Sequence, residues 1–197
     1  MSRSDHVSGG GAGVAVAAVT ALAGVALVVT AWFVVGSSHA VFPALVTCLW
    51  VGAAAFVGPG VGDSIPVHWT RVSSRELNWH RRLGVARFDR LLEWIGWNRV
   101  VRAMRGAAAP LDRSAVGDLQ RHVRAAMAGH AMAAVVHLAV TVACLLAGSM
   151  VSAAVTAAAG AVLHGWPMLL QRSTLARIQR LRRTRSVHSS WHEENGP

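Results

Sequence analysis

Four long apolar stretches dominate the sequence and predict four membrane-spanning helices. They cover residues 13–35, 41–57, 125–147 and 150–170, and none of them contains Asp, Glu, Lys or Arg. About 20 apolar residues suffice to cross the hydrocarbon core of a bilayer. Only a few residues separate the members of each pair, 36–40 in the first and Gly148 and Ser149 in the second. We therefore expect an all-α membrane protein built from two helical hairpins.

A cleaved signal peptide is the alternative interpretation of the first apolar stretch. Ser38, His39 and Ala40 resemble a cleavage site. However, the apolar core of a signal peptide has only about 7–15 residues. The greater length of this stretch favours a retained span.

Small residues within the four stretches predict that the helices pack closely as a bundle. Glycine and alanine let the backbones of membrane helices approach one another. Glycines occur in all four stretches, and we single out Gly24, Gly52, Gly129 and Gly160.

The segment between the two hairpins is predicted to form amphipathic helices, because its apolar residues recur at helical spacing among basic residues. A helix is expected over residues 74–83, with Ser73 and Glu76 at the spacing of a capping box and Gly84 at its end. A second helix is expected over residues 85–95, where apolar residues recur on one helical face. These residues are Val85, Phe88, Leu91, Leu92 and Ile95. Such amphipathic helices lie in the membrane interface with their apolar face in the lipid.

The same segment concentrates residues that suit the membrane surface. After a third amphipathic piece at residues 100–104, Asp112 is expected to cap the helix that enters the third span. Four of the eight tryptophans of the chain lie in this segment, and tryptophan favours the headgroup level. Single Arg and Trp residues near spans are more often anchors than ligands. The density of the segment raises the chance of a shared headgroup pocket, for which Trp79, Asn98 and Arg99 are the candidate substrate-binding residues.

The distribution of arginine predicts the orientation in the membrane. All 19 basic residues are arginine, and the formal net charge is +10. One arginine precedes the first span, twelve lie between residues 58 and 124, six follow Leu170, and the two short connections have none. Positively charged residues stay on the cytoplasmic side of a membrane. We therefore expect both termini and residues 59–124 in the cytoplasm, in a multi-pass protein of the cell membrane.

Composition excludes several classes of protein. Only 14% of the residues are charged, whereas a soluble domain carries about 25% charge. Arginine-rich chains also bind nucleic acid, but this one has no RNA-binding signature, zinc finger or separate basic domain. Membrane lipids are therefore the expected partners, through their anionic headgroups. Cys48 and Cys144 lie inside apolar stretches without metal-binding spacing, so neither a metal site nor a cofactor is expected.

Three histidines, His130, His137 and His164, lie inside apolar stretches and are candidates for function. His130 and His137 are seven residues apart, so they share a helix face but lie about 10 Å apart along the axis. This distance is too great for one metal ion to bind both. The simpler interpretation of each is a neutral imidazole that is hydrogen-bonded to a neighbouring helix. His130 lies about one turn inside the cytoplasmic boundary, where a general base meets substrates of the inner leaflet.

The stretch "ELNWHRRLGVARFDRLLEWIGWNR" resembles the central segment of the glycosyl-4,4'-diaponeurosporenoate acyltransferases, small membrane proteins of staphyloxanthin-type carotenoid synthesis. Glu76, Trp79, the Leu83-Gly84-Val85 turn and Phe88 fit the pattern of that family. Two further motifs follow in the same order and at comparable spacing, so that the resemblance covers about residues 69–181.

The first of these motifs is a Glu-x-x-His at the start of the third span, and His130 matches its histidine. The second is a basic motif after the fourth span. Here Pro167, Gln171, Arg172 and Arg177 match, whereas the Tyr-Asn-Arg of the family motif is missing.

The resemblance implies an enzyme that transfers a fatty acyl group to a glycosylated lipid or carotenoid at the inner leaflet. It implies His130 as the base that activates a sugar hydroxyl and Glu76 as an acid/base or substrate-orienting residue. Arg172 and Arg177, with Gln171, would bind the phosphates of a thioester co-substrate, which is an acyl-CoA or an acyl carrier.

One departure from the family pattern leaves the activity open. Met127 stands where the family has the glutamate of Glu-x-x-His. A thioether cannot orient an imidazole or hold a proton as a carboxylate does. Either Glu76 takes that role, or this member has diverged or lost activity.

Two functions therefore stay open, together with the oligomeric state. An acyltransferase requires His130, Glu76 and Arg172 to converge on a lipid-sized groove. The alternative is a non-catalytic scaffold or partner subunit that binds anionic lipid headgroups. A transporter is less supported, because no pair of broken helices and no inverted repeat is visible.

The sequence thus divides into five expected parts. They are an N-terminal tail (1–12), a first transmembrane hairpin (13–58), a cytoplasmic interfacial helical segment (59–124), a second transmembrane hairpin (125–170) and a basic cytoplasmic tail (171–197).

Overall fold

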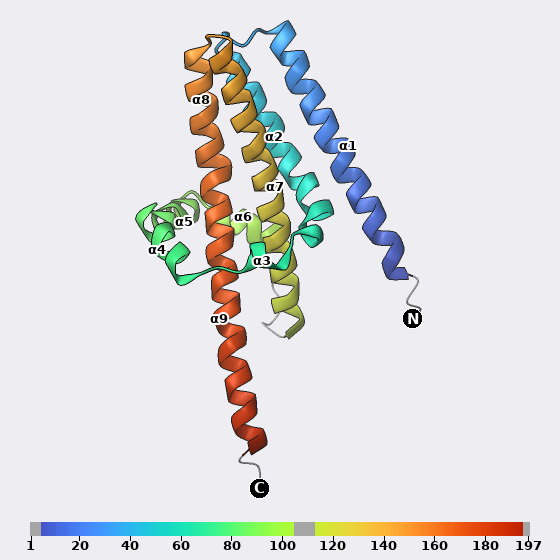
Figure 1. Cartoon of the computed structure of the whole chain (residues 1–197), viewed down its shortest axis with the longest axis vertical. Helices are drawn as coiled ribbons and strands as arrows, with labels where there is room; N and C mark the ends of the chain where they lie inside the picture. Colours follow the sequence, from blue (N-terminus) through green and yellow to red (C-terminus); the bar gives the residue numbers. More distant parts are fainter. Residues whose placement is uncertain (1–4, 105–112, 195–197) are drawn as a thin grey trace. The chain divides into compact units, whose positions relative to one another are not determined.

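The computed structural model describes residues 5–104 and 113–194, and all regular elements in these residues are helices (Figure 1). In chain order they are α1 (Asp5–Val34), α2 (Val41–Val61), η1 (Gly62–Ser64), α3 (Val67–Thr70), α4 (Ser74–Arg82), α5 (Val85–Trp94), α6 (Trp97–Met104), α7 (Arg113–Leu146), α8 (Met150–Gly160), η2 (Ala161–Gly165) and α9 (Trp166–Glu194). The all-α prediction is confirmed. The cap predicted at Asp112 lies outside the described residues.

Four helical stretches are long and apolar enough to cross a membrane. Within the described residues these are Gly11–Val34, Val41–Ser64, Val116–Leu146 and Met150–Arg182. They contain the four stretches predicted from hydropathy almost completely, and they are arranged as hairpin pairs. The chain is therefore a multi-pass membrane protein.

The chain divides into two compact units. Unit 1 comprises Met1–Ile65 and Arg124–Met168, and unit 2 comprises Pro66–Val123 and Leu169–Pro197. In unit 1 the hydroxyls of Ser37 and Ser149, which lie in the turns of the two hairpins, are 3.0 Å apart. Both hairpins of unit 1 therefore turn at the same end of the bundle, as Figure 1 shows.

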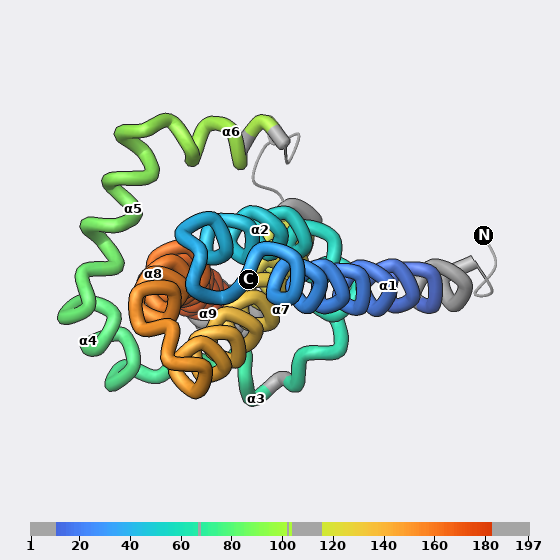
Figure 2. The backbone as a smooth tube through the Cα atoms, turned by 90° about the horizontal axis from the view of Figure 1, so that it is seen from above, coloured from blue at the N-terminus to red at the C-terminus, as the bar shows by residue number. Residues whose placement is uncertain are grey.

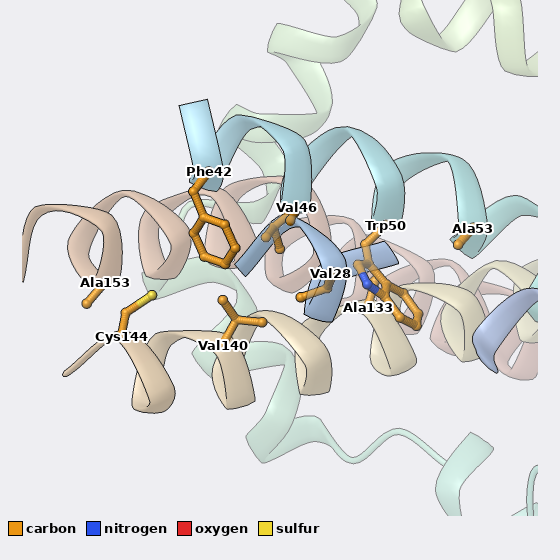
Figure 3. Close-up of a cluster of buried hydrophobic side chains, with 10 residues drawn as sticks. Val28, Phe42, Val46, Trp50, Ala53, Ala133, Val140, Cys144 and Ala153 are labelled. Carbon is orange, nitrogen blue, oxygen red and sulfur yellow. The ribbon is translucent and has the colours of Figure 1, made fainter. Parts of the chain in front are cut away.

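The core of unit 1 is built on one face of α2. Phe42, Val46 and Trp50 recur at intervals of four residues, and each is almost completely buried. Figure 3 shows the side chains of Phe42 and Val46 directed toward Val140 and Cys144 of α7, and the ring of Trp50 beside Ala133 of the same helix. Burying large aliphatic and aromatic side chains of this kind stabilises the bundle through close packing. Cys144 is buried in this core, Cys48 is exposed, and both are free thiols.

Glycines allow the helices of unit 1 to pack closely, but not at every predicted position. A Cβ atom at Gly129 would lie 2.2 Å from the carbonyl oxygen of Ala54, and one at Gly160 would lie 2.6 Å from Cβ of His137. Backbones meet at Gly129, and at Gly160 the helix meets a histidine side chain, so these two predictions are confirmed. Gly24 has a tight contact with Trp50, whereas Gly52 has no neighbour within 4 Å, so the prediction for Gly52 is wrong.

Unit 2 contains the short helices predicted between the hairpins. Figure 2 shows α4, α5 and α6 following one another with a sharp turn at each junction. The turns occur at Gly84 and Gly96, whose φ angles of +72° and +79° suit glycine. Ser73 caps α4 by accepting a hydrogen bond from the backbone N–H of Glu76 at 3.1 Å, which confirms the predicted capping residue.

The apolar face predicted for residues 85–95 is only partly covered by protein. Val85, at the start of α5, is buried, whereas Leu91 and Ile95 are exposed. Trp94 beside them is 83% exposed. A helix with so much uncovered apolar surface suits the interface of a membrane, where lipid covers that surface.

Candidate functional site

Glu76 on α4 and Arg172 on α9 form the central ion pair of unit 2. Arg172 binds both carboxylate oxygens, Nε donating to Oε1 and Nη2 donating to Oε2 at 2.9 Å. Two parallel bonds of this kind are stronger and more directional than a single contact. The hydrogen bond from Arg172 is the main cause of the lowered pKa of Glu76, which burial opposes, so this carboxylate is ionised at neutral pH.

The same face of α9 holds the chain just before α4. Arg172 also donates to the carbonyl oxygens of Trp69 and Arg71. Two turns further along α9, Gln179 donates to the carbonyl of Thr70 at 2.6 Å and accepts from the N–H of Val72 at 3.4 Å. These contacts fix the start of α4 on α9, and thereby the position of Glu76.

His80 connects Glu76 to a serine of α9. Its Nδ1 lies 2.9 Å from Oγ of Ser173, and its Nε2 lies 3.4 Å from Oε1 of Glu76. The side chain is only 4% exposed. Burial lowers the pKa of His80, more than the neighbouring carboxylate raises it, so the imidazole is neutral at neutral pH. Glu76, His80 and Ser173 therefore form a carboxylate–imidazole–hydroxyl cluster, in which Ser173 donates to the carbonyl of Leu169 at 3.0 Å and Nε2 of His80 has no hydrogen-bond partner.

A cavity of about 330 Å³ opens beside this cluster within unit 2. Helices α4, α5 and α9 line it, and both His80 and Ser173 contribute to its wall. Its remaining wall includes three arginines, which are Arg81, Arg177 and Arg180. The cavity thus combines positive charge with a neutral imidazole and a hydroxyl, a combination that suits an anionic substrate with a reactive carbonyl.

The six candidate substrate-binding residues from the sequence fall into four groups. Arg177 lines the cavity, and Asn98 donates at 3.3 Å to Asp89, which also lines it. Arg172 is bound to Glu76. Trp79 is 54% exposed under the guanidinium of Arg82, 5.5 Å from its ring centroid.

Neither Arg99, on α6, nor Gln171, on α9, lines the cavity. The roles of both residues stay predictions.

His130 belongs to unit 1, whereas Glu76 and Arg172 belong to unit 2. Within unit 1, Nδ1 of His130 lies 3.3 Å from Nδ1 of His164. The ring of His164 also contacts the ring of His137, with 4.8 Å between their centroids. These contacts fit the interpretation of neutral imidazoles bonded between helices. They also give His130 a partner that the sequence did not predict, and its catalytic role stays a prediction.

The sequence analysis missed His80 and Ser173. One local signal was present, because Glu76 and His80 are four residues apart and share a face of a short helix. Ser173 gave no signal, because it meets His80 across 93 residues of chain. Among the residues that the structure describes, no three His, Cys, Asp or Glu side chains are grouped so that they could hold a metal ion.

The sequence of the chain was compared with known protein families, curated proteins and solved structures. The profile of the family described as glycosyl-4,4'-diaponeurosporenoate acyltransferase (CrtO) matches residues 66–184. No significant match was found among curated proteins or among solved structures. The matched residues are more than half of the chain, and they include the ion pair, the His80–Ser173 contact and the entire wall of the cavity. The chain therefore belongs to the glycosyl-4,4'-diaponeurosporenoate acyltransferase family.

Proposed function

We propose that this protein transfers a fatty acyl group from a thioester donor to a sugar hydroxyl of a glycosylated carotenoid. The family acts in carotenoid biosynthesis, and its description implies a glycosylated carotenoid as substrate. The observation that carries the proposal is the arginine-lined cavity beside Glu76, His80 and Ser173, which lies wholly within the residues matched by the family.

The arginines of the cavity suit the donor. Acyl-CoA and acyl carrier proteins both present the thioester on an arm that carries phosphate. Guanidinium groups bind phosphate with two directed hydrogen bonds. Arg177 is the best candidate, because it lines the cavity, whereas Arg172 is already bound to Glu76 and to two backbone carbonyls.

The acceptor is proposed to enter from the cytoplasmic leaflet. The span that begins at Met150 needs about 20 residues to cross the bilayer, which brings it to the surface near Leu170. Ser173 and Arg177 follow directly after this point. The concentration of arginine in residues 58–124 and after Leu170 supports a cytoplasmic position for that surface.

We propose His130 as the general base for the acceptor. Its side chain is partly exposed, and its Nδ1 is engaged with His164. With one ring nitrogen held in this way, Nε2 is the atom that can take the proton of a sugar hydroxyl. His164 thereby supplies the contact that the Glu-x-x-His motif of the family would supply through the position of Met127.

Lipid extracts from cells with and without the protein test this function. We expect the extract of cells with the wild-type protein to contain an acylated glycosyl carotenoid when the glycosylated precursor is supplied. His130→Ala is expected to abolish this product without lowering the abundance of the protein in the membrane. Arg177→Ala is expected to lower it about tenfold, the loss of one charge-assisted hydrogen bond.

Arg87→Ala is the matched control for Arg177→Ala, because Arg87 is exposed and does not line the cavity. It is expected to leave the product unchanged. Identical lipid extracts with and without the wild-type protein would exclude the enzyme and favour a membrane scaffold.

A further inference from the structure

Three histidines of unit 1 are in contact inside the membrane-spanning part of the bundle. His164, in the turn η2, lies between the other two, with 5.5 Å from its ring centroid to that of His130 and 4.8 Å to that of His137. His130 and His137 are seven residues apart on α7, which is about two helical turns. The ring of His164 therefore connects two levels of α7.

The backbone around His164 places its ring against His137. A Cβ atom at Gly160 would lie 2.6 Å from Cβ of His137, so a glycine at this position lets α8 approach the histidine closely. Directly after Gly160 the helix widens into a π-helical turn, Ala161–Gly165, which contains His164. Turns of this kind are frequent at functional sites. The position of His164 between two histidines thus has a structural cause in the sequence.

The carbonyl of Ala133 determines which nitrogen of His137 carries the proton. Nδ1 of His137 lies 2.9 Å from this oxygen, and a carbonyl can only accept a hydrogen bond. None of the four apolar stretches contains a carboxylate, and an imidazolium without such a partner is costly inside a bilayer, so the ring is neutral. Its single proton is therefore on Nδ1, and Nε2 is a bare lone pair. His137 is 1% exposed, and this Nε2 has no hydrogen-bond partner among the described residues.

His164 can supply the donor that His137 lacks. It is also 1% exposed, and its Nε2 likewise has no partner in the described parts of the chain. Its Nδ1 lies 3.3 Å from Nδ1 of His130, and a hydrogen bond between these two atoms contains one proton. If His164 supplied that proton, two buried rings in contact would both present bare lone pairs. If His130 supplies it, His164 carries its own proton on Nε2, as a donor for the lone pair of His137.

The second arrangement leaves fewer buried groups unsatisfied. A buried donor or acceptor without a partner costs free energy, whereas a donor that meets an acceptor removes this cost for both atoms. The Nε2 atoms of His137 and His164 do not bond directly. One water molecule between the two rings would accept from His164 and donate to His137, in the way that buried water satisfies polar groups in other proteins.

We infer that His137 is a positioning residue that determines the tautomer of His130. The bare Nε2 of His137 keeps the proton of His164 on Nε2, so that Nδ1 of His164 accepts from Nδ1 of His130. His130 then has a lone pair on Nε2, which is what a general base requires. The inference deepens the proposed function and rests on it for its consequence, because the tautomer matters to acyl transfer only if His130 is the base.

Nitrogen NMR measures the tautomer directly. The protonated and the bare nitrogen of a neutral imidazole have well-separated ¹⁵N shifts. The full-length protein, labelled with ¹⁵N-histidine, is measured in lipid vesicles, and variants that each lack one histidine assign the signals. We expect His130 of the wild type to carry its proton on Nδ1, and His164 to carry its proton on Nε2.

His137→Phe and His137→Gln form a matched pair. Phenylalanine keeps a ring but cannot accept a hydrogen bond, whereas the side chain of glutamine ends in a carbonyl oxygen that can. In His137→Phe the proton of His130 is expected to move to Nε2, and the acylated lipid is expected to fall at least about tenfold, the factor that one unmade buried hydrogen bond corresponds to. His137→Gln is expected to keep the tautomer of the wild type and to restore most of the product.

His122→Phe is the control on the same helix. Nδ1 of His122 also contacts the carbonyl four residues earlier, that of Asp118, at 2.8 Å, but this histidine is exposed. Its replacement is expected to change neither the tautomer of His130 nor the amount of product.

The outcomes separate this inference from the proposed function. A proton on Nε2 of His130 in the wild type overturns the inference, and this measurement needs no variant to fold. The inference also fails if His130 keeps its proton on Nδ1 in His137→Phe, or if the proton moves to Nε2 in His137→Gln. A wild type that makes no acylated lipid removes the proposed function instead, while the tautomers of His130 in the two variants still decide whether His137 controls them.

Discussion

Glu76 is the single residue on which the polar contacts of unit 2 depend most. Its carboxylate binds Arg172 and approaches His80, and its backbone N–H is capped by Ser73. Both partners of the ion pair are largely shielded from water, so removal of one charge leaves the other without its partner. An unpaired group of this kind costs about 1–3 kcal/mol. Glu76→Gln is therefore expected to lower the stability of the protein in detergent by that amount at pH 7.

The pH dependence of this effect has a defined sign. The pKa of Glu76 in the folded protein is lowered from its ordinary value of 4.5, chiefly by the hydrogen bond from Arg172. The ion pair therefore stabilises the folded state fully above the ordinary pKa, and this contribution is lost as the pH falls through the lowered pKa. Thermal unfolding of the wild type and of Glu76→Gln should differ at pH 7 and converge below about pH 4.5.

Asp118→Asn is the matched control for Glu76→Gln. Asp118 also pairs with an arginine, Arg121, but both side chains are more than half exposed. Exposed pairs contribute about 0.5 kcal/mol or less. An equal loss in the two variants would show that the Glu76–Arg172 pair is no more than a surface contact.

The sequence drew attention to Glu76 and Arg177, but it gave no indication of which residues contact them. Glu76 stood out because a capping-box spacing is local, and Arg177 stood out through a short basic motif. The partner of His80 lies 93 residues away in the sequence, and that of Glu76 lies 96 residues away. No periodicity or spacing within a helix encodes such a contact, because it depends on which faces of two distant helices meet.

At the scale of helices, the packing of α2 against α7 depends on glycine. A Cβ atom at Gly129 would overlap the carbonyl oxygen of Ala54 at 2.2 Å, and that atom is backbone and cannot rotate away. Gly129→Ala is therefore expected to separate the two helices and to destabilise the protein by about 1–3 kcal/mol. A lower midpoint of thermal unfolding in detergent would measure this loss.

Gly52→Ala is the control, because a Cβ atom at Gly52 meets nothing within 4 Å. Gly52 lies in the same helix as Ala54, and the substitution is again glycine to alanine. Its unfolding midpoint is expected to match that of the wild type. A loss as large as that of Gly129→Ala would indicate an effect of glycine on the helix itself rather than on packing.

Hydropathy predicted the spans well and the ends of the helices poorly. A bilayer imposes a minimum apolar length, and that requirement is written directly into the sequence. Helix α7 begins at Arg113, directly after the residue expected to cap it, whereas its apolar stretch begins only at residue 125; α9 continues to Glu194, beyond the end of its apolar stretch at residue 170. These extensions carry many polar residues. Their helical state does not depend on apolar length, so hydropathy gives no signal for it.

At the scale of the whole molecule, the two units combine segments from distant parts of the chain. The first hairpin joins Arg124–Met168 in unit 1, and Pro66–Val123 joins Leu169–Pro197 in unit 2. Division of the sequence by hydropathy separates spans from polar segments, but it cannot pair one segment with another. The pairing instead follows from tertiary contacts, such as those of Arg172 and Gln179 with the chain before α4.

The proposed orientation places every arginine of the chain on the cytoplasmic side, and it can be tested by labelling from outside the cell. Single cysteines at two exposed positions, Ser38→Cys and Arg90→Cys, are introduced after Cys48 and Cys144 have been replaced by alanine. A membrane-impermeant maleimide is expected to label Ser38→Cys in intact cells, because it lies in the turn of the first hairpin. Arg90→Cys, on α5, is expected to react only after lysis, because α5 carries arginines that stay inside. Labelling of Arg90→Cys in intact cells would place the cavity of unit 2 outside, away from the thioester donors of the cytoplasm, and would remove the basis of the acyl transfer proposed here.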